Sequence, residues 1–201
     1  PELSVEKDTY LEVIYSLKLV GLVITSDLCW QAHVNYTITR VNKVLWQLTR
    51  FKQLGASTYK LVVFYILKIR SILMFGSACF HSALTSEQRE RLELQQKRSL
   101  AIILGSNYRN YEHARKLLNL ADLNSLRESV CLKWAVKAAG NPQHNHLFPL
   151  NQSGVITRNQ HKYYEYRCKG SRFYHSAVPA MVRSLNQSYS SKLGSQQATK
   201  K

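Results

Sequence analysis

The spacing of apolar residues changes near the start of the chain from a strand-like run to a helical repeat. Residues 17–24 are mostly aliphatic or β-branched, which predicts a strand, and Gly21 within them predicts a bulge or a close backbone approach. Residues 11–15 alternate and predict its hairpin partner, with the turn near residues 16–18. From about Trp30 to Gln53, apolar residues recur at steps of three and four, which predicts an amphipathic helix. Its apolar face comprises Val34, Ile38, Val41, Leu45 and Leu48.

Further helical repeats follow, separated by glycines and capping residues. They predict helices over residues 57–76, 85–104, 111–120 and 125–139, and a short helix around 178–185. The fold class expected is mainly α: a helical bundle with a short N-terminal β-hairpin and an irregular basic C-terminal segment. The expected regions are residues 1–28 for the hairpin, 29–140 for the helical domain, 141–186 for the basic and aromatic segment, and 187–201 for a disordered tail.

The charge of the chain is strongly positive, with 28 Lys and Arg against 12 Asp and Glu, a net +16. Such a balance favours polyanions, of which nucleic acid is the commonest and an anionic membrane surface the rival. No acidic residue lies between Asp27 and Glu87. On the first predicted helix, Arg40, Lys43 and Arg50 lie opposite the apolar face. This stripe fits a solvated face and a face that binds nucleic acid about equally well.

A second basic stretch, residues 158–174, interleaves cations with aromatic residues. Cations neutralise phosphates and aromatic rings stack on bases, so this stretch is a second candidate for nucleic-acid binding. Its candidate ligands are Arg158, Lys162, Arg167 and Lys169. The alternative, given equal weight, is an irregular segment whose tyrosines pack on the helices.

The sequence offers no constellation for catalysis or for a metal. The three aspartates (Asp8, Asp27 and Asp122) are far apart, and Asp27 is better explained as a helix cap than as a metal ligand. His144 and His146 lack further ligands nearby, so a polar surface loop is expected there. No nucleophile elbow and no phosphate-binding glycine loop is present. The expectation is therefore no catalytic residue, no metal and no cofactor in this chain.

Cysteine and tryptophan positions add expectations about the environment and the core. The four cysteines form no Cys-x-x-Cys pair, which predicts buried free thiols in a reducing, intracellular setting, cytoplasmic or nuclear. The longest apolar runs are interrupted by Lys18 and Lys68, so no membrane span is expected. Trp30, Trp46 and Trp134 fall on helical patterns and are expected in the core or in an interface.

A family resemblance rests on the order and spacing of several motifs. Residues 18–24, followed by Ser26-Asp27-Leu28-x-Trp30-x-x-His33, resemble the run that ends the palm subdomain of non-LTR retrotransposon reverse transcriptases. Later stretches continue the likeness: Asn42-Lys43, Phe64-Tyr65-x-x-x-Ile69-Arg70-Ser71-Ile72-Leu73, Leu92-Glu93-x-x-Gln96-Lys97-Arg98 and Arg172-Phe173-Tyr174-His175-Ser176-Ala177-Val178-Pro179. Together they cover most of residues 10–186.

The resemblance implies a non-catalytic C-terminal fragment of an RNA-directed DNA polymerase, with a palm-edge hairpin and a thumb-like helical domain. The family's paired catalytic aspartates lie upstream of the hairpin and are absent from this chain, so Mg²⁺ is expected only in the missing palm. The implied partners are that palm and a primer–template duplex, held by Arg40, Lys43, Arg50 and Lys18. The opening residue, Pro1, also suggests a piece of a longer protein. The alternative is a helical protein-interaction scaffold with apolar patches around Phe75 and Phe80.

Overall fold

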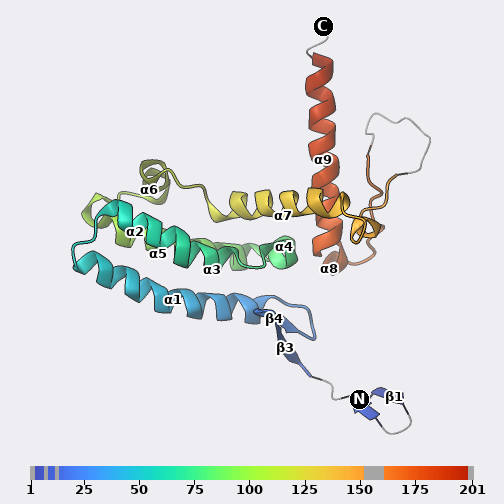
Figure 1. Ribbon diagram of the computed structural model, residues 1–201, viewed down its shortest axis with the longest axis horizontal. Helices are drawn as coiled ribbons and strands as arrows, with labels where there is room; N and C mark the ends of the chain where they lie inside the picture. The colour runs from blue at the N-terminus through green and yellow to red at the C-terminus, as the bar shows by residue number, and fades with distance from the viewer. Residues whose placement is uncertain (1–2, 7–8, 12–13, 152–160, 199–201) are drawn as a thin grey trace. The chain divides into compact units, whose positions relative to one another are not determined.

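The computed structural model describes residues 3–6, 9–11, 14–151 and 161–198, with side chains for 14–151 and 161–191 (Figure 1). The chain folds as two compact units. The first comprises Pro1–Phe75 and Ser86–Asn119, and the second comprises Gly76–Thr85 and Leu120–Lys201. The predicted fold class is confirmed: the described chain is mainly helical and has β-hairpins only near its N-terminus.

The first unit holds all four described strands and the longest helix. Its strands are β1 (Leu3–Glu6), β2 (Thr9–Leu11), β3 (Ser16–Leu19) and β4 (Leu22–Thr25). Its helices are α1 (Gln31–Gln53), α2 (Thr58–Phe64), the π-helix η1 (Tyr65–Arg70), α3 (Ser71–Met74), α5 (Ser86–Leu104), the 3-10 turn η3 (Gly105–Asn107) and α6 (Tyr111–Leu118). The second unit holds α4 (Ser77–Phe80), η2 (His81–Ala83), α7 (Leu123–Ala139), η4 (Asn145–Leu147), α8 (Ser171–Tyr174) and α9 (Ala177–Ala198).

The predicted continuous strand over residues 17–24 is wrong, because the chain reverses in its middle. Leu19 pairs with Leu22, so Val20 and Gly21 form a two-residue turn between the antiparallel strands β3 and β4. Both turn residues have positive φ, +47° and +87°, as a tight hairpin turn with the native strand twist requires. The predicted partner strand over residues 11–15 is not formed as a unit: Leu11 belongs to β2, which pairs with β1, and Tyr15 accepts the amide of Ser26 (2.9 Å) beside the β3–β4 pair. Residues 12 and 13 lie outside the described residues.

Gly21 meets a second constraint besides its backbone conformation. A Cβ atom at this position would lie 3.0 Å from Cε1 of Phe75, so the aromatic ring occupies the space that a side chain would need. The close approach expected at this glycine therefore comes from a side chain after α3. Phe75 remains 48% exposed, while Phe80 is buried, so the apolar patch expected around Phe80 is wrong.

Helix α1 follows its predicted pattern closely. Val34, Val41, Leu45 and Leu48 are buried, and α1 lies along α5 and along the α2–α3 helix (Figure 1). The helix ends at Gln53, as predicted. The opposite face of α1 remains in contact with solvent.

The helix that runs from α2 to α3 contains a π segment in its middle. Leu61, Tyr65, Ile69 and Leu73 are buried, at regular steps of four residues. In an α-helix each such step rotates the side chain by about 40°, so a buried row of this length would wind away from the core. The wider turn of η1 reduces this rotation and keeps the row on one face. The helix is not buried on every side, because Leu67 is 64% exposed.

A chain of buried polar groups joins three helices of the first unit. Tyr65 donates its hydroxyl to Oε1 of Gln96 (2.5 Å), and Nε2 of Gln96 donates to the hydroxyl of Tyr111 (2.8 Å). The Tyr111 hydroxyl donates in turn to Glu93. Burial and the Glu93 carboxylate raise the pKa of Tyr111, so this hydroxyl keeps its proton. These directional bonds fix how α5 and α6 meet the α2–η1–α3 helix.

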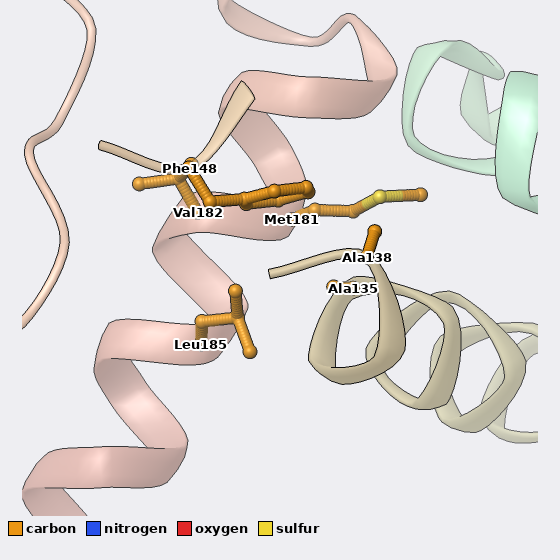
Figure 2. Close-up of a cluster of buried hydrophobic side chains, with 6 residues drawn as sticks. All are labelled: Ala135, Ala138, Phe148, Met181, Val182 and Leu185. Atoms are coloured by element: carbon orange, nitrogen blue, oxygen red, sulfur yellow. The ribbon is translucent and has the colours of Figure 1, made fainter. Parts of the chain in front are cut away.

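Apolar residues from three elements form the core of the second unit (Figure 2). They are Ala135 and Ala138 of α7, Phe148 after η4, and Met181, Val182 and Leu185 of α9. Two sequence predictions here are wrong. Helix α7 begins at Leu123, before the predicted start at residue 125, and Asp122 caps it, since its Oδ1 accepts the amide of Ser125 (2.8 Å). The tail predicted to be disordered is helical through Ala198.

One helical stretch, Thr58–Ala83, is long and apolar enough to cross a membrane by length and composition, which the interrupted apolar runs did not lead us to expect. The core helices of soluble proteins pass the same test, so this is weak support for a membrane span.

We predict that Gly21→Ala destabilises the protein more than Gly55→Ala. Both glycines have positive φ, +87° and +81°, so alanine at either position should cost about 1–2 kcal/mol in backbone strain. A Cβ at Gly21 would also be crowded by the Phe75 ring, whereas nothing lies within 4 Å of a Cβ at Gly55. Overpacking against the ring should therefore lower the free energy of unfolding of Gly21→Ala by a further ~1–3 kcal/mol, as measured by urea denaturation. Equal losses would contradict the steric part of this account.

Candidate nucleic-acid interface

The exposed face of α1 displays three of the predicted ligands. Arg40, Lys43 and Arg50 are all exposed and recur at steps of three and seven residues, which places them on one side of the helix. With Tyr36, one turn before Arg40, they span about 21 Å at 1.5 Å per residue. The predicted stripe therefore exists as one continuous helix face.

The β3–β4 hairpin brings Lys18 to the same face. Its Nζ lies 4.7 Å from the centre of the Tyr36 ring, and the guanidinium of Arg40 lies 5.7 Å from that centre. Lys18, chiefly by hydrogen bonding to the Tyr36 side chain and also through its charge, lowers the pKa of Tyr36. The backbone amide of Val23 donates to Nδ1 of His33 (3.4 Å), which attaches the hairpin to the start of α1.

Two arginines of α5, which we did not predict from the sequence, extend this basic face from α1 onto α5. Arg91 donates to Oδ1 of Asn35 (2.7 Å), and Arg98 donates to Oδ1 of Asn42 (3.0 Å). Seven residues separate the two arginines, and seven separate the two asparagines, so the same pairing repeats after two helical turns. A neutral amide orders each guanidinium and leaves its charge uncompensated.

We call these six residues the cationic surface: Lys18, Arg40, Lys43, Arg50, Arg91 and Arg98. Among the side chains that the structure describes, no carboxylate forms an ion pair with any of them, whereas Lys97 pairs with Glu90 (2.5 Å) and Arg115 with Glu112 (2.8 Å). The surface can therefore offer unneutralised positive charge to a polyanion.

Lys52 shows that a cation on α1 need not be available to a ligand. Its Nζ donates to the backbone carbonyls of Ile102 (2.5 Å) and Ile103 (2.8 Å) at the end of α5. Carbonyls at a helix C-terminus lack partners within the helix and favour a positive charge. Lys52 therefore has a structural role.

The tryptophans were expected in the core or in an interface, and Trp46 is not in the core, since it is 64% exposed among the cations of α1. The guanidinium of Arg50 lies 5.5 Å from its ring centre. Trp134, on α7 of the second unit, is also exposed, at 41%. The thiols are free as expected but not buried, since Cys29 and Cys79 are exposed and Cys131 and Cys168 are half-buried.

The second basic segment lies in the second unit, except Arg158, which is outside the described residues. The buried side chain of Asn186 accepts the amide of Tyr163 (2.9 Å) and donates to its carbonyl (3.0 Å), which holds the segment on α9. Lys162 lies 5.5 Å from the ring centre of Tyr163 and 5.6 Å from that of Tyr189, while Arg167 and Lys169 are exposed.

The aromatic residues of this segment divide between packing and exposure. Tyr163 and Tyr166 pack against the core of the second unit, as the packing alternative predicted. Tyr164 and Phe173 are 44% and 48% exposed, and each makes an edge-to-face contact with Tyr166. The packing interpretation therefore holds for Tyr163 and Tyr166, while nucleic-acid binding by this segment stays a prediction.

The described aspartates serve local backbone structure. Asp27 does not cap α1 as predicted; its Oδ1 accepts the amide of Cys29 (2.9 Å) and the hydroxyl of Thr25 in the loop before the helix. Asp122 caps α7, and Asp8 lies outside the described residues. Across the described part of the chain, no group of three or more His, Cys, Asp or Glu residues could hold a metal ion.

Comparison of the chain with protein-family models, with curated proteins and with solved structures found no match. The interface therefore has to be interpreted from its own chemistry and from the motifs in the sequence.

We predict that the first unit loses stability as the pH falls below about 6.5. Burial lowers the pKa of His33 below its ordinary value of 6.5, so the folded state favours the neutral ring. That contribution to stability is complete above pH 6.5 and is lost as the pH falls toward the lowered pKa. Protonation of Nδ1 would also remove the acceptor for Val23.

The measurement is the free energy of unfolding between pH 7.5 and 5, compared with His33→Gln, whose side chain does not titrate. The wild-type protein should lose more stability than the variant over this range. Parallel curves for the two proteins would contradict the role given to His33.

Proposed function

We propose that the cationic surface binds a nucleic-acid duplex through its phosphates, as the non-catalytic C-terminal part of a reverse transcriptase of the non-LTR retrotransposon type. The observation that carries the nucleic-acid part is the set of six cations on α1, α5 and the β3–β4 hairpin, whose charges no described carboxylate neutralises. The reverse transcriptase part rests on the sequence resemblance. The chain by itself catalyses nothing in this proposal.

The dimensions of the surface suit a duplex backbone. The length of about 21 Å from Tyr36 to Arg50 equals about six base-pair steps at 3.4 Å each. Lysine and arginine on a straight helix contact phosphates without reading base edges, so we expect binding that is sensitive to salt and tolerant of sequence.

Three of the motifs that carry the resemblance contribute residues to this surface. The hairpin contains Lys18, the junction with α1 contains Trp30 and His33, and α5 contains Arg98. In the proposed role the hairpin and α1 support the end of a primer–template duplex. The exposed Arg167 and Lys169 of the second unit are separate candidates for phosphate contacts.

A helical protein-interaction scaffold is the second candidate, and the β3–β4 hairpin favours it. Leu17 and Leu19 of β3 and Val20 of the turn are 46%, 53% and 83% exposed, and neighbouring exposed aliphatic residues are a feature of protein-interaction sites. In the first proposal these residues contact the upstream polymerase palm. In the second they bind an unrelated protein, and the basic surface is incidental.

We predict that Arg40→Ala/Lys43→Ala/Arg50→Ala weakens binding to a primer–template duplex and flattens its salt dependence. Loss of three phosphate contacts should reduce the slope of log affinity against log salt by about 2.7, at about 0.9 per contact. The measurement is fluorescence anisotropy of a labelled duplex at several salt concentrations.

The matched control is Lys60→Ala/Lys68→Ala/Arg109→Ala, which removes the same charge from exposed positions of the first unit outside the cationic surface. It should change the slope by less than about one. If the two triple variants lose affinity equally, net charge rather than this surface accounts for binding. If wild-type protein does not bind the duplex, the scaffold becomes the better explanation.

A further inference from the structure

Trp46 is the aromatic residue whose position the duplex-binding role leaves unexplained. It lies on the exposed face of α1, and its indole is 64% exposed although Leu45 beside it is buried. Residues 42 and 43 lie one turn before it, and Arg50 lies one turn after it, so cations flank the ring along the helix. A contact with phosphates alone does not require a tryptophan at this point.

The surroundings of the ring indicate the chemistry of its partner. Arg50 lies 5.5 Å from the ring centre, and Arg98 is held beside the preceding turn by its bond to Asn42. An apolar peptide over the indole would have to remove water from Lys43, Arg50 and Arg98 without compensating their charge. A nucleotide matches both features, because its base stacks on the ring while its phosphates bind the cations.

The second aromatic ring on this surface does not offer the same site. Tyr36 is half-buried, and both Lys18 and Arg40 lie over its ring. The face of the Tyr36 ring is therefore occupied by these two cations. Trp46 has one such contact, with Arg50, and most of its surface remains accessible.

We infer that Trp46 is a stacking platform for an unpaired nucleobase, in a strand whose phosphates bind Lys43, Arg50 and Arg98. This inference rests on the proposed function and specifies its ligand. Bases inside a duplex are covered on both faces by their neighbours, whereas a single-stranded extension presents a free face. The ligand is therefore a duplex with an unpaired extension, and α1 contacts the junction between the two.

The test measures binding of the 201-residue chain to two labelled probes: a blunt 12-base-pair duplex and the same duplex with a four-nucleotide 3′ extension. Trp46→Ala should weaken binding of the extended probe by about 5- to 150-fold, the range for loss of one base stack. Binding of the blunt probe should change by less than about twofold. Because Trp46 is exposed, the thermal unfolding of the variant should match that of the wild-type protein.

Three further variants separate stacking from other causes. Trp46→Phe keeps an aromatic face and should retain most of the affinity for the extended probe, whereas Trp46→Leu keeps an apolar side chain and should lose it. Tyr59→Ala removes another exposed aromatic ring of the first unit, 77% exposed and outside the cationic surface, and should have no effect. Equal losses for Trp46→Phe and Trp46→Leu would overturn the stacking role.

Intrinsic fluorescence gives a direct readout. With Trp30→Phe/Trp134→Phe, emission comes from Trp46 alone and should be quenched by the extended probe more than by the blunt one. With Trp30→Phe/Trp46→Phe, emission comes from Trp134 and should not distinguish the probes. No selective quenching of Trp46, with duplex binding still lost in the Arg40, Lys43 and Arg50 variant, overturns this inference and leaves the proposed function standing. Failure of wild-type protein to bind either probe overturns both.

Discussion

Helix α1 buries only one of its faces, and the organisation of the first unit follows from that. Val34, Val41, Leu45 and Leu48 bury this face within the first unit, whose helices α5 and α2–α3 lie along α1. Since aliphatic burial fixes the rotation of α1, its remaining positions necessarily face solvent. The cations and the tryptophan at those positions share one surface because the core has already determined which way the helix faces.

The rotation of α5 is fixed in a different way, by directional bonds. Gln96 is fully buried and bonds to Tyr65 on one side and Tyr111 on the other, so turning α5 would leave buried polar groups without these partners. This orientation separates the charges of α5 into two sets. Lys97 pairs with Glu90, while Arg91 and Arg98 reach the asparagines of α1. A buried amide thereby determines which arginines join the cationic surface.

Features set by the local sequence pattern could be predicted, whereas features set by contacts between distant segments could not. The extent and buried face of α1 followed from its repeat, and Trp46 could have been placed outside from its offset relative to Val41 and Leu45. The β3–β4 turn was missed because Val20 is β-branched and disfavours the positive φ that it adopts. Arg91 and Arg98 could not be assigned from sequence, because their role depends on which face of α5 meets α1. The end of α9 is rich in Ser and Gln, a composition typical of disordered segments, so its helix was not predicted.

Net charge is therefore an incomplete guide to what this chain can bind. The net charge of the sequence is +16, but Lys52 donates to carbonyls at the C-terminus of α5. Lys97 and Arg115 each form an ion pair with a carboxylate and also lie over the Tyr111 ring. Arg91 and Arg98, by contrast, bond to neutral amides and keep their charge. The partner of each cation therefore decides whether it can bind a polyanion. A guanidinium that bonds to a neutral amide is held in place, but its positive charge is not neutralised.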